Sequence, residues 1–163
     1  MEPVEKRGAG FTLIELLVVL AIIGVVAAAV TVVALPGDSG RARDEARRLA
    51  ALLESAMRES RASGHAIAWS AERDRYAFWQ RDEDGDWVTY PPQSVYRPRA
   101  LAERIELAAV RVDGRELARG ERVVFAPQGL RRRVSATVAG ADAWFYIEGD
   151  VIGRVTLERV YAR

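Results

Sequence analysis

The N-terminal part of this chain contains an apolar run that is long enough to cross a membrane. Residues 10–35 read GFTLIELLVVLAIIGVVAAAVTVVAL, and between Leu16 and Leu35 the only polar interruption is Thr31. A bilayer core about 30 Å thick is spanned by about 20 apolar helical residues. We therefore expect one transmembrane helix over residues 11–35, and the rest of the chain must fold on one side of the membrane.

The residues ahead of this helix, MEPVEKRGAG, include Lys6 and Arg7. Basic residues stay on the cytoplasmic side, so the C-terminal part is expected on the opposite side. An ordinary secretory signal has an apolar core of about 7–15 residues ahead of its cleavage point, whereas here Gly10 precedes a longer run. A conventional signal cut near Ala27 or Ala34 is the alternative, but the length of the run favours an intact helix.

Glu15 is the one acid in the apolar run. A carboxylate at the bilayer centre costs about 2.5–3.5 kcal/mol on insertion scales and less near the edge. The side chain can reach the headgroups from about one helical turn inside the membrane, or it can pair with an opposite charge during assembly. Both interpretations can hold at different stages.

The motif GFTLIELL, from Gly10 to Leu17, resembles that of the type IV pilin-like family. The resemblance implies that residues 1–10 are a leader, which a membrane-embedded prepilin peptidase removes by cleavage between Gly10 and Phe11. It also implies N-methylation of Phe11 and pairing of Glu15 with the terminal amine of a neighbouring subunit. Two opposite charges removed from water satisfy one another, whereas either one alone is costly.

A second helix is expected to continue the stem over residues 36–63. The breakers Pro36 and Gly37 predict a kink, and Asp38 or Ser39 can cap the helix that Gly64 ends. Helical spacing resumes after residue 40, and one apolar stripe is expected to pack on the following domain. The stripe comprises Ala42, Ala46, Leu49, Leu53, Ala56 and Met57.

Alternating runs and turn residues replace helical spacing after Gly64, which predicts a β-rich head over residues 64–163. Asp84-Gly85 and Asp113-Gly114 are hairpin signals, and one helical turn is expected over residues 100–104. We predict an α+β, pilin-like fold in which a long N-terminal helix packs on an antiparallel sheet or sandwich. The expected strands cover residues 65–69, 75–80, 86–90, 105–112, 122–125, 133–138, 143–148 and 155–160.

The head is similar to the H-type minor pseudopilin of type II secretion, through the segments VVFAPQG and GDVIGRVTL. Many type IV pilins close a disulfide loop, and this chain has no cysteine, which favours a pseudopilin. The resemblance implies a structural subunit that helps to form or cap the pseudopilus tip for protein export across the outer membrane. The implied location is the inner membrane, single-pass, with the head in the periplasm. Implied partners are other major and minor pseudopilins, prepilin peptidase, inner-membrane lipid and the secreted proteins.

Residues suited to catalysis are few, so we expect no enzyme and no cofactor. His65 is the only histidine, and the spacing of His65, Ser70 and Asp74 does not indicate a strained nucleophile turn. The acidic segment 82–86 departs from the EF-hand register, because Gly85 separates two aspartates and Gln93 stands where a closing acid belongs. We therefore expect a solvated hairpin tip, with calcium binding as the alternative and no metal site assigned.

The alternative function is that of a type IV minor pilin that binds DNA in natural transformation. Arg131, Arg132 and Arg133 could meet phosphate together with Arg115, Arg119 and Arg122 if all lay on one side. The net charge of the chain is only +1, and Glu116 and Glu121 interrupt the basic residues. Nucleic acid is therefore not expected as a partner.

The head carries four tryptophans, Trp69, Trp79, Trp87 and Trp144. Most are expected in the core or in cross-strand pairs, because large aromatic side chains dominate small sandwich cores. Trp79 and Trp87 flank the acidic hairpin and are expected to face one another across it. A tryptophan that lies exposed would indicate a surface for a partner.

Overall fold

The computed structural model describes residues 13–34, 38–128, 132–150 and 152–160. The chain divides into two compact units, Met1–Pro36 and Gly37–Arg163. Helix α1 (Leu13–Ala34) forms the described part of the first unit, and the second unit is the head. The predicted leader, residues 1–10, lies outside the described residues, as does Phe11.

Helix α2 (Asp38–Ser63) is the amphipathic helix that the sequence predicts, and it belongs to the head unit. It ends at a left-handed Gly64, whose φ is 75° and whose N–H donates to the Ser60 carbonyl over 3.1 Å. The predicted stripe faces the core, except that Met57 is only half-buried. The buried residues of the stripe are Ala42, Ala46, Leu49, Leu53 and Ala56.

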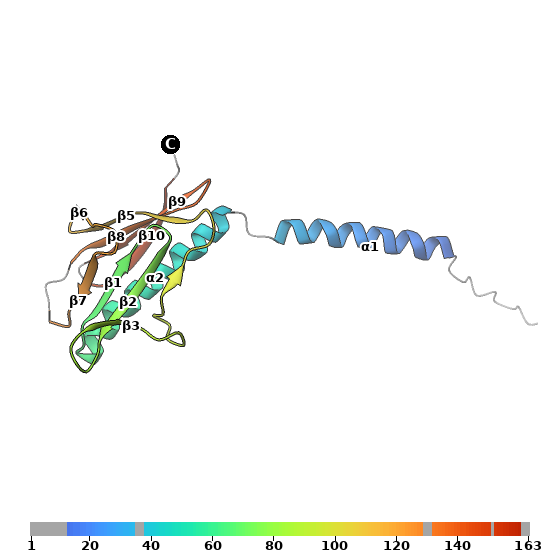
Figure 1. Cartoon of the computed structure of the whole chain (residues 1–163). Coiled ribbons are helices and arrows are strands. Elements are labelled where there is room, and N and C mark those ends of the chain that lie inside the picture. Colours follow the sequence, from blue (N-terminus) through green and yellow to red (C-terminus); the bar gives the residue numbers. More distant parts are fainter. Residues whose placement is uncertain (1–12, 35–37, 129–131, 151, 161–163) are drawn as a thin grey trace, which may run out of the picture. The chain divides into compact units, whose positions relative to one another are not determined.

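The described strands form two antiparallel sheets (Figure 1). The first sheet has the order β3-β2-β1-β7, and short β4 pairs with β2 on the same edge as β3. The second sheet has the order β10-β9-β8-β5-β6. The strands of the first sheet are β1 (Ile67–Ala71), β2 (Arg75–Arg81), β3 (Trp87–Thr89), β4 (Arg99–Ala100) and β7 (Arg122–Phe125). Those of the second are β5 (Glu106–Val112), β6 (Arg115–Glu116), β8 (Val134–Ala139), β9 (Trp144–Gly149) and β10 (Val155–Val160).

The expected helical turn over residues 100–104 is wrong. Arg99–Ala100 instead forms β4, and the N–H of Leu101 donates to the carbonyl of Asp74 over 2.8 Å. Arg104 has a φ of 65°, in the left-handed region, which a right-handed helical turn does not allow. The start of β2 has a free backbone edge at this point, so pairing with β2 replaces local helical hydrogen bonds.

The Asp113-Gly114 hairpin signal is confirmed. Val112 pairs with Arg115, so the connection between β5 and β6 has two residues. Asp113 and Gly114 both have positive φ, at 51° and 83°, which is the pattern of a type I′ turn. The turn matches the twist of the paired strands and fixes their register.

A single hydrophobic core joins α2 to both sheets. Helix α2 contacts β8, β9 and β10 of the second sheet and β1 and β7 of the first (Figure 1). The largest fully buried hydrophobic side chains come from all three layers: Leu49 from α2, Trp69, Tyr76 and Phe78 from the first sheet, and Val138 and Ile147 from the second. The head is therefore one packed unit of which α2 is a part.

A buried carboxylate lies in this core. Glu45 is 8% exposed, and its Oε1 accepts the Tyr76 hydroxyl over 2.8 Å while its Oε2 accepts Arg48 Nη1 over 2.5 Å. Burial raises the pKa of Tyr76 above its ordinary value, and the negative charge of Glu45 raises it further. The contact ties the first sheet to α2, and helical periodicity alone does not predict it.

Tyr76→Phe is expected to lower the free energy of unfolding by about 1–3 kcal/mol, because it leaves one oxygen of a buried carboxylate without its donor. The raised pKa of Tyr76 also predicts a pH effect. Below pH about 10 the contribution of the Tyr76 hydroxyl to the free energy of unfolding is fully present. This contribution is lost as the pH rises further, because the tyrosine ionises at a lower pH in the unfolded chain than in the folded one. Urea denaturation at neutral and alkaline pH measures both effects. Tyr146→Phe is the control, and equal alkaline losses in wild type and Tyr76→Phe would contradict this account.

Candidate functional site

The structure places Glu15 in the first turn of α1, where its side chain is exposed. A negative charge is favourable at this end of the helix dipole. Gly10 and Phe11, the predicted cleavage residues, lie outside the described part of the chain. The site on the stem therefore consists, in the described residues, of Glu15 on an apolar helix.

The surface of α1 around Glu15 is apolar on all sides. Every side chain described in this helix, from residue 13 to residue 25, is exposed. Among the described residues, no helix combines the length and the apolarity that a membrane crossing requires. The exposed large apolar side chains are Leu13, Ile14, Leu16, Leu17, Val18, Val19, Leu20, Ile22, Ile23 and Val25. Helices that are hydrophobic all round are covered in the functional state by lipid or by other protein.

Two tryptophans on the outer face of the first sheet are stacked against arginines. The Arg122 guanidinium lies 4.1 Å from the ring centre of Trp79, and that of Arg81 lies 4.3 Å from Trp87. Register pairs Trp79 with Thr89 and Trp87 with Arg81, so the prediction that the two tryptophans face one another is wrong. The indole N–H of Trp79 donates to Ser70 Oγ over 2.9 Å, which accounts for its polar atom.

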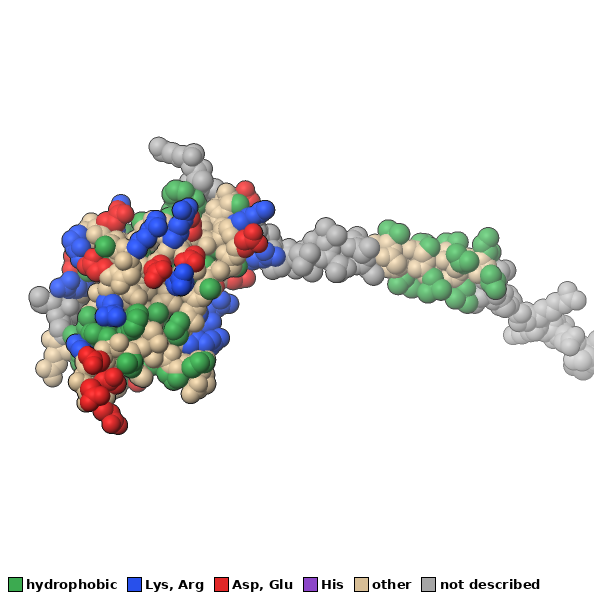
Figure 2. Space-filling view, in the orientation of Figure 1, with side chains coloured by type: hydrophobic (Ala, Val, Ile, Leu, Met, Phe, Trp, Pro, Cys, Tyr) green, Lys and Arg blue, Asp and Glu red, His purple; other side chains and the backbone are tan. Residues whose placement is uncertain are grey.

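The acidic loop between β2 and β3 forms an exposed tip, as predicted (Figure 2). Asp82 closes it, because Oδ1 of Asp82 accepts the N–H of Asp86 over 2.8 Å, and the left-handed Gly85, with φ of 87°, donates its N–H to the Asp82 carbonyl. Within the described residues, no three acidic or histidine side chains are grouped so that they could hold a metal ion.

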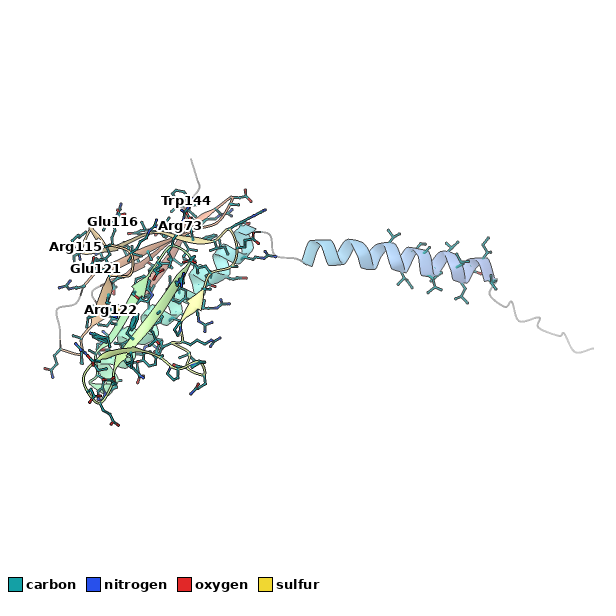
Figure 3. All side chains as sticks on the ribbon, viewed as in Figure 1. Arg73, Arg115, Glu116, Glu121, Arg122 and Trp144 are labelled. Atoms are coloured by element: carbon teal, nitrogen blue, oxygen red, sulfur yellow. The ribbon has the colours of Figure 1, made fainter. Side chains whose placement is uncertain are left out.

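Two of the arginines proposed as a phosphate-binding cluster, Arg115 and Arg133, are paired with acids. Arg115 and its partner Glu121 are labelled in Figure 3. Arg115 contacts Glu121 at 2.5 Å, and this hydrogen bond, with one from the backbone N–H of Ala118, holds the pKa of Glu121 below its ordinary value. Arg111 lies 3.7 Å from Glu116, Arg133 lies 3.6 Å from Glu148, and Arg122 stacks on Trp79. Arg131 lies outside the described residues. The structure brings Arg115, Arg122 and Arg132 to the lining of one hollow, where Glu121 lies among them.

The three residues that could resemble a nucleophile set are engaged separately. Ser70 is buried and accepts the Trp79 indole N–H, and Asp74 contacts Arg75 at 3.2 Å. The described contacts of His65 are made by its backbone N–H, which donates to Ser63 Oγ, and its side chain is exposed. No hydrogen bond joins His65, Ser70 and Asp74 in the described structure.

An exposed apolar patch lies on the outer face of the second sheet. Trp144 is 43% exposed and pairs in register with Val160, which is 44% exposed. The neighbouring Tyr146 is half-buried on the same face. We call Trp144, Tyr146 and Val160 the second-sheet patch. The sequence does not reveal it, because Trp144 and Phe145 are adjacent and only the register shows that Phe145 is the one that faces inward.

Comparison with known proteins bears on both parts of the chain. The prokaryotic N-terminal methylation motif matches residues 6–31, which include the predicted cleavage junction and Glu15. The structure is similar to that of the minor pseudopilin EpsH from the type 2 secretion system of Vibrio cholerae, with a TM-score of 0.55 and 16% identity. That match covers 74% of this chain and 97% of the EpsH chain. A second crystal structure of EpsH matches with a TM-score of 0.57 at 15% identity, over 76% of this chain and 95% of that chain. No curated protein matches the chain.

The chain carries a prokaryotic N-terminal methylation motif, and its head has a fold similar to that of the minor pseudopilin EpsH. The α+β architecture predicted from the sequence is confirmed, including the helix packed on antiparallel sheets. The chain therefore combines an N-terminal methylation motif with a folded head. The candidate sites are thus the exposed outer faces of the two sheets in the head and Glu15 on α1.

Proposed function

We propose that this chain is a structural minor pseudopilin of a type II secretion pseudopilus and acts at or near the filament tip. The observation that carries the proposal is the combination of a prepilin-type methylation motif over residues 6–31 with a head of the minor pseudopilin fold. In this role the chain is anchored in the inner membrane by the helix expected over residues 11–35, and the head lies in the periplasm. Its function is association with other subunits.

Assembly, in this proposal, begins when prepilin peptidase cleaves between Gly10 and Phe11 and methylates the new amine. Glu15 then pairs with the Phe11 amine of a neighbouring subunit as the apolar stems pack side by side. Support comes from the position of Glu15 in the first turn of α1, close in sequence to the new terminus. The surrounding apolar side chains exclude water, so pairing satisfies two charges that are each costly alone.

The second-sheet patch is the surface that we propose for docking onto another pseudopilin head. It is apolar and exposed, and its central residue is a tryptophan, the residue type most enriched in binding hot spots. The outer face of the first sheet is less suited, because Arg81 and Arg122 already cover the rings of Trp87 and Trp79.

Trp144→Ala is expected to weaken association with the neighbouring head by about 2 kcal/mol or more, while the stability of the isolated chain changes little. Copurification of neighbouring pseudopilins and thermal unfolding of the purified chain measure the two effects. Trp87→Ala is the matched control, because Trp87 is a half-buried tryptophan on the other sheet. Equal loss of copurification in both variants would contradict the assignment of the surface.

Photocrosslinking in the native membrane tests the function as a whole. Lys6 is the sole lysine of the chain, so amine-reactive reagents cannot report on the head. A photoreactive phenylalanine analogue is therefore introduced at position 144 and, as a control, at position 83 in the acidic tip. Capture of pseudopilins from position 144 supports the proposal. Capture of type IV pilus subunits, together with a defect in DNA uptake when the gene is deleted, would instead assign the chain to natural transformation.

A further inference from the structure

A hollow rimmed by arginines lies in the head between the start of α2 and the edge strand β10. Its volume is about 600 Å³. Phe145, which is buried, and Leu157, which is half-buried, supply its apolar lining, while the exposed Arg43, Arg47 and Arg159 supply the charged side chains. Ser39 and Gly40 complete the lining. We call this set of residues the arginine hollow.

Two of the three arginines around the arginine hollow have no acidic partner among the described residues. None of its lining residues is acidic. Arg48 and Arg58 of the same helix contact Glu45 and Glu54, whereas Arg43 and Arg47 have no carboxylate partner among the described residues. The guanidinium groups of Arg43 and Arg47 can therefore attract an anion, and their planar forks match the oxygens of a phosphate group.

Backbone groups add to this positive potential. The N–H groups in the first turn of a helix have no partner within the helix, and the dipole of a helix as long as α2 places partial positive charge there. Ser39 and Gly40 belong to that turn and line the hollow. Gly40 has no side chain, so an anion can approach the backbone closely.

The segment of sequence that connects α1 to this turn is short. Four residues lie between Ala34, where α1 ends, and Ser39, and the five Cα–Cα steps between these two residues span at most about 18 Å when fully extended. On the proposed function, the membrane helix ends at residue 35, on the periplasmic side. The start of α2 is then within reach of the phosphates of the lipid headgroups.

We propose that the arginine hollow binds a phosphate group, and that in the membrane this group belongs to the headgroup of an anionic phospholipid. Arg43, Arg47 and Arg159 hold the phosphate oxygens, and the apolar lining lies against the glycerol and the first carbons of the acyl chains. The assignment of a lipid headgroup as the ligand rests on the proposed function, in which the chain is inserted in the membrane. The affinity of the hollow for phosphate does not depend on that insertion. Such a contact would fix the head against the bilayer before the subunit enters a filament.

Native mass spectrometry of the detergent-extracted full chain tests the proposal. The chain is incubated with equal amounts of phosphatidylglycerol and phosphatidylcholine, and the retained lipids are counted. Wild type is expected to retain phosphatidylglycerol preferentially, and the double variant Arg43→Gln with Arg47→Gln is expected to retain about tenfold less. The matched control, Arg41→Gln with Arg58→Gln, removes the same charge from the same helix but changes no residue of the hollow, so it should retain lipid like wild type.

Equal retention by both double variants would overturn the site, because the attraction would then be a diffuse effect of charge. A second arm adds inorganic phosphate to the lipid-free chain in detergent and follows amide hydrogen exchange over residues 39–47. Weak protection from exchange that disappears in the Arg43→Gln, Arg47→Gln variant supports the site. Binding of inorganic phosphate as tight as that of phosphatidylglycerol would overturn the lipid headgroup as the source of the phosphate group. Failure of the proposed function is distinguishable, because it would appear as failed insertion or filament entry in wild type, with the phosphate arm unchanged.

Discussion

Glu15→Leu is expected to leave membrane insertion intact and to abolish incorporation of the chain into filaments. Leucine makes the apolar run more hydrophobic, so insertion does not suffer. In the filament, however, the methylated amine of Phe11 on a neighbouring subunit would lose its partner away from water. Removing one member of a buried ion pair costs about 3–5 kcal/mol, which corresponds to a loss of more than two orders of magnitude in association.

Fractionation of membranes and of sheared filaments measures the two outcomes separately. Glu15→Gln tests whether charge is required, because glutamine keeps the size and polarity of the side chain, and it should fail like Glu15→Leu. Thr31→Leu is the matched control, since it removes another polar residue from the same run and should assemble normally. If Glu15→Gln entered filaments as well as wild type, the pairing role would have to be abandoned.

Gly10→Val is expected to block removal of the leader. A peptidase must bring the scissile carbonyl close to its catalytic groups, and a β-branched side chain next to that bond obstructs the approach that glycine allows. The chain would keep its ten N-terminal residues, MEPVEKRGAG, which intact-mass spectrometry detects directly. Assembly would fail too, because the free Phe11 amine that pairs with the glutamate of a neighbouring subunit would never be formed.

Gly8→Val is the control for this experiment, because it introduces the same side chain two residues earlier in the same leader. It should be processed like wild type. A mature chain that began at Phe11 despite Gly10→Val would show that cleavage does not depend on this glycine. A native product that began near residue 27 or 34 would instead favour the conventional signal peptide and would remove the stem on which assembly depends.

Local patterns in the sequence predict most of the elements of the head. Helical spacing locates α2, and the expected strand over residues 122–125 coincides with β7. Each of the other long strands begins and ends within two residues of its expected bounds, because alternation and turn residues act over short distances. Local patterns predict a sheet or a sandwich but do not show which strands belong to which sheet, since that depends on contacts such as β1 with β7 that join residues far apart in sequence.

Pairings between distant elements account for most of what the sequence does not reveal. Glu45 shares a helix face with the buried Ala42 and Leu49, where a charged side chain is not expected, yet the hydroxyl of Tyr76 and the guanidinium of Arg48 allow it to be buried. Short β4 forms where a helical turn was expected, because the edge of β2 provides backbone partners. In each case a contact across the fold outweighs a local preference.

The candidate sites also differ in whether their residues are continuous in sequence. The motif around Gly10, Phe11 and Glu15 is continuous in sequence, so it can be recognised without a structure. The second-sheet patch and the arginine hollow are assembled from separate segments, and Arg43 and Arg47 alone predict only a solvated helix face. They become candidates once β10 brings Arg159 beside them.

The packing of α2 determines how the head could be shed from its anchor. Leu49 and Leu53 belong to the same core as Trp69 and Ile147, so α2 is an integral part of the packed head. A protease that hydrolysed the chain ahead of Asp38 would release a folded, soluble domain. Cleavage after Ser63 would instead allow α2 to dissociate from the sheets and would expose the aromatic core residues to further digestion. The position of the first cleavage would therefore decide between shedding and complete degradation.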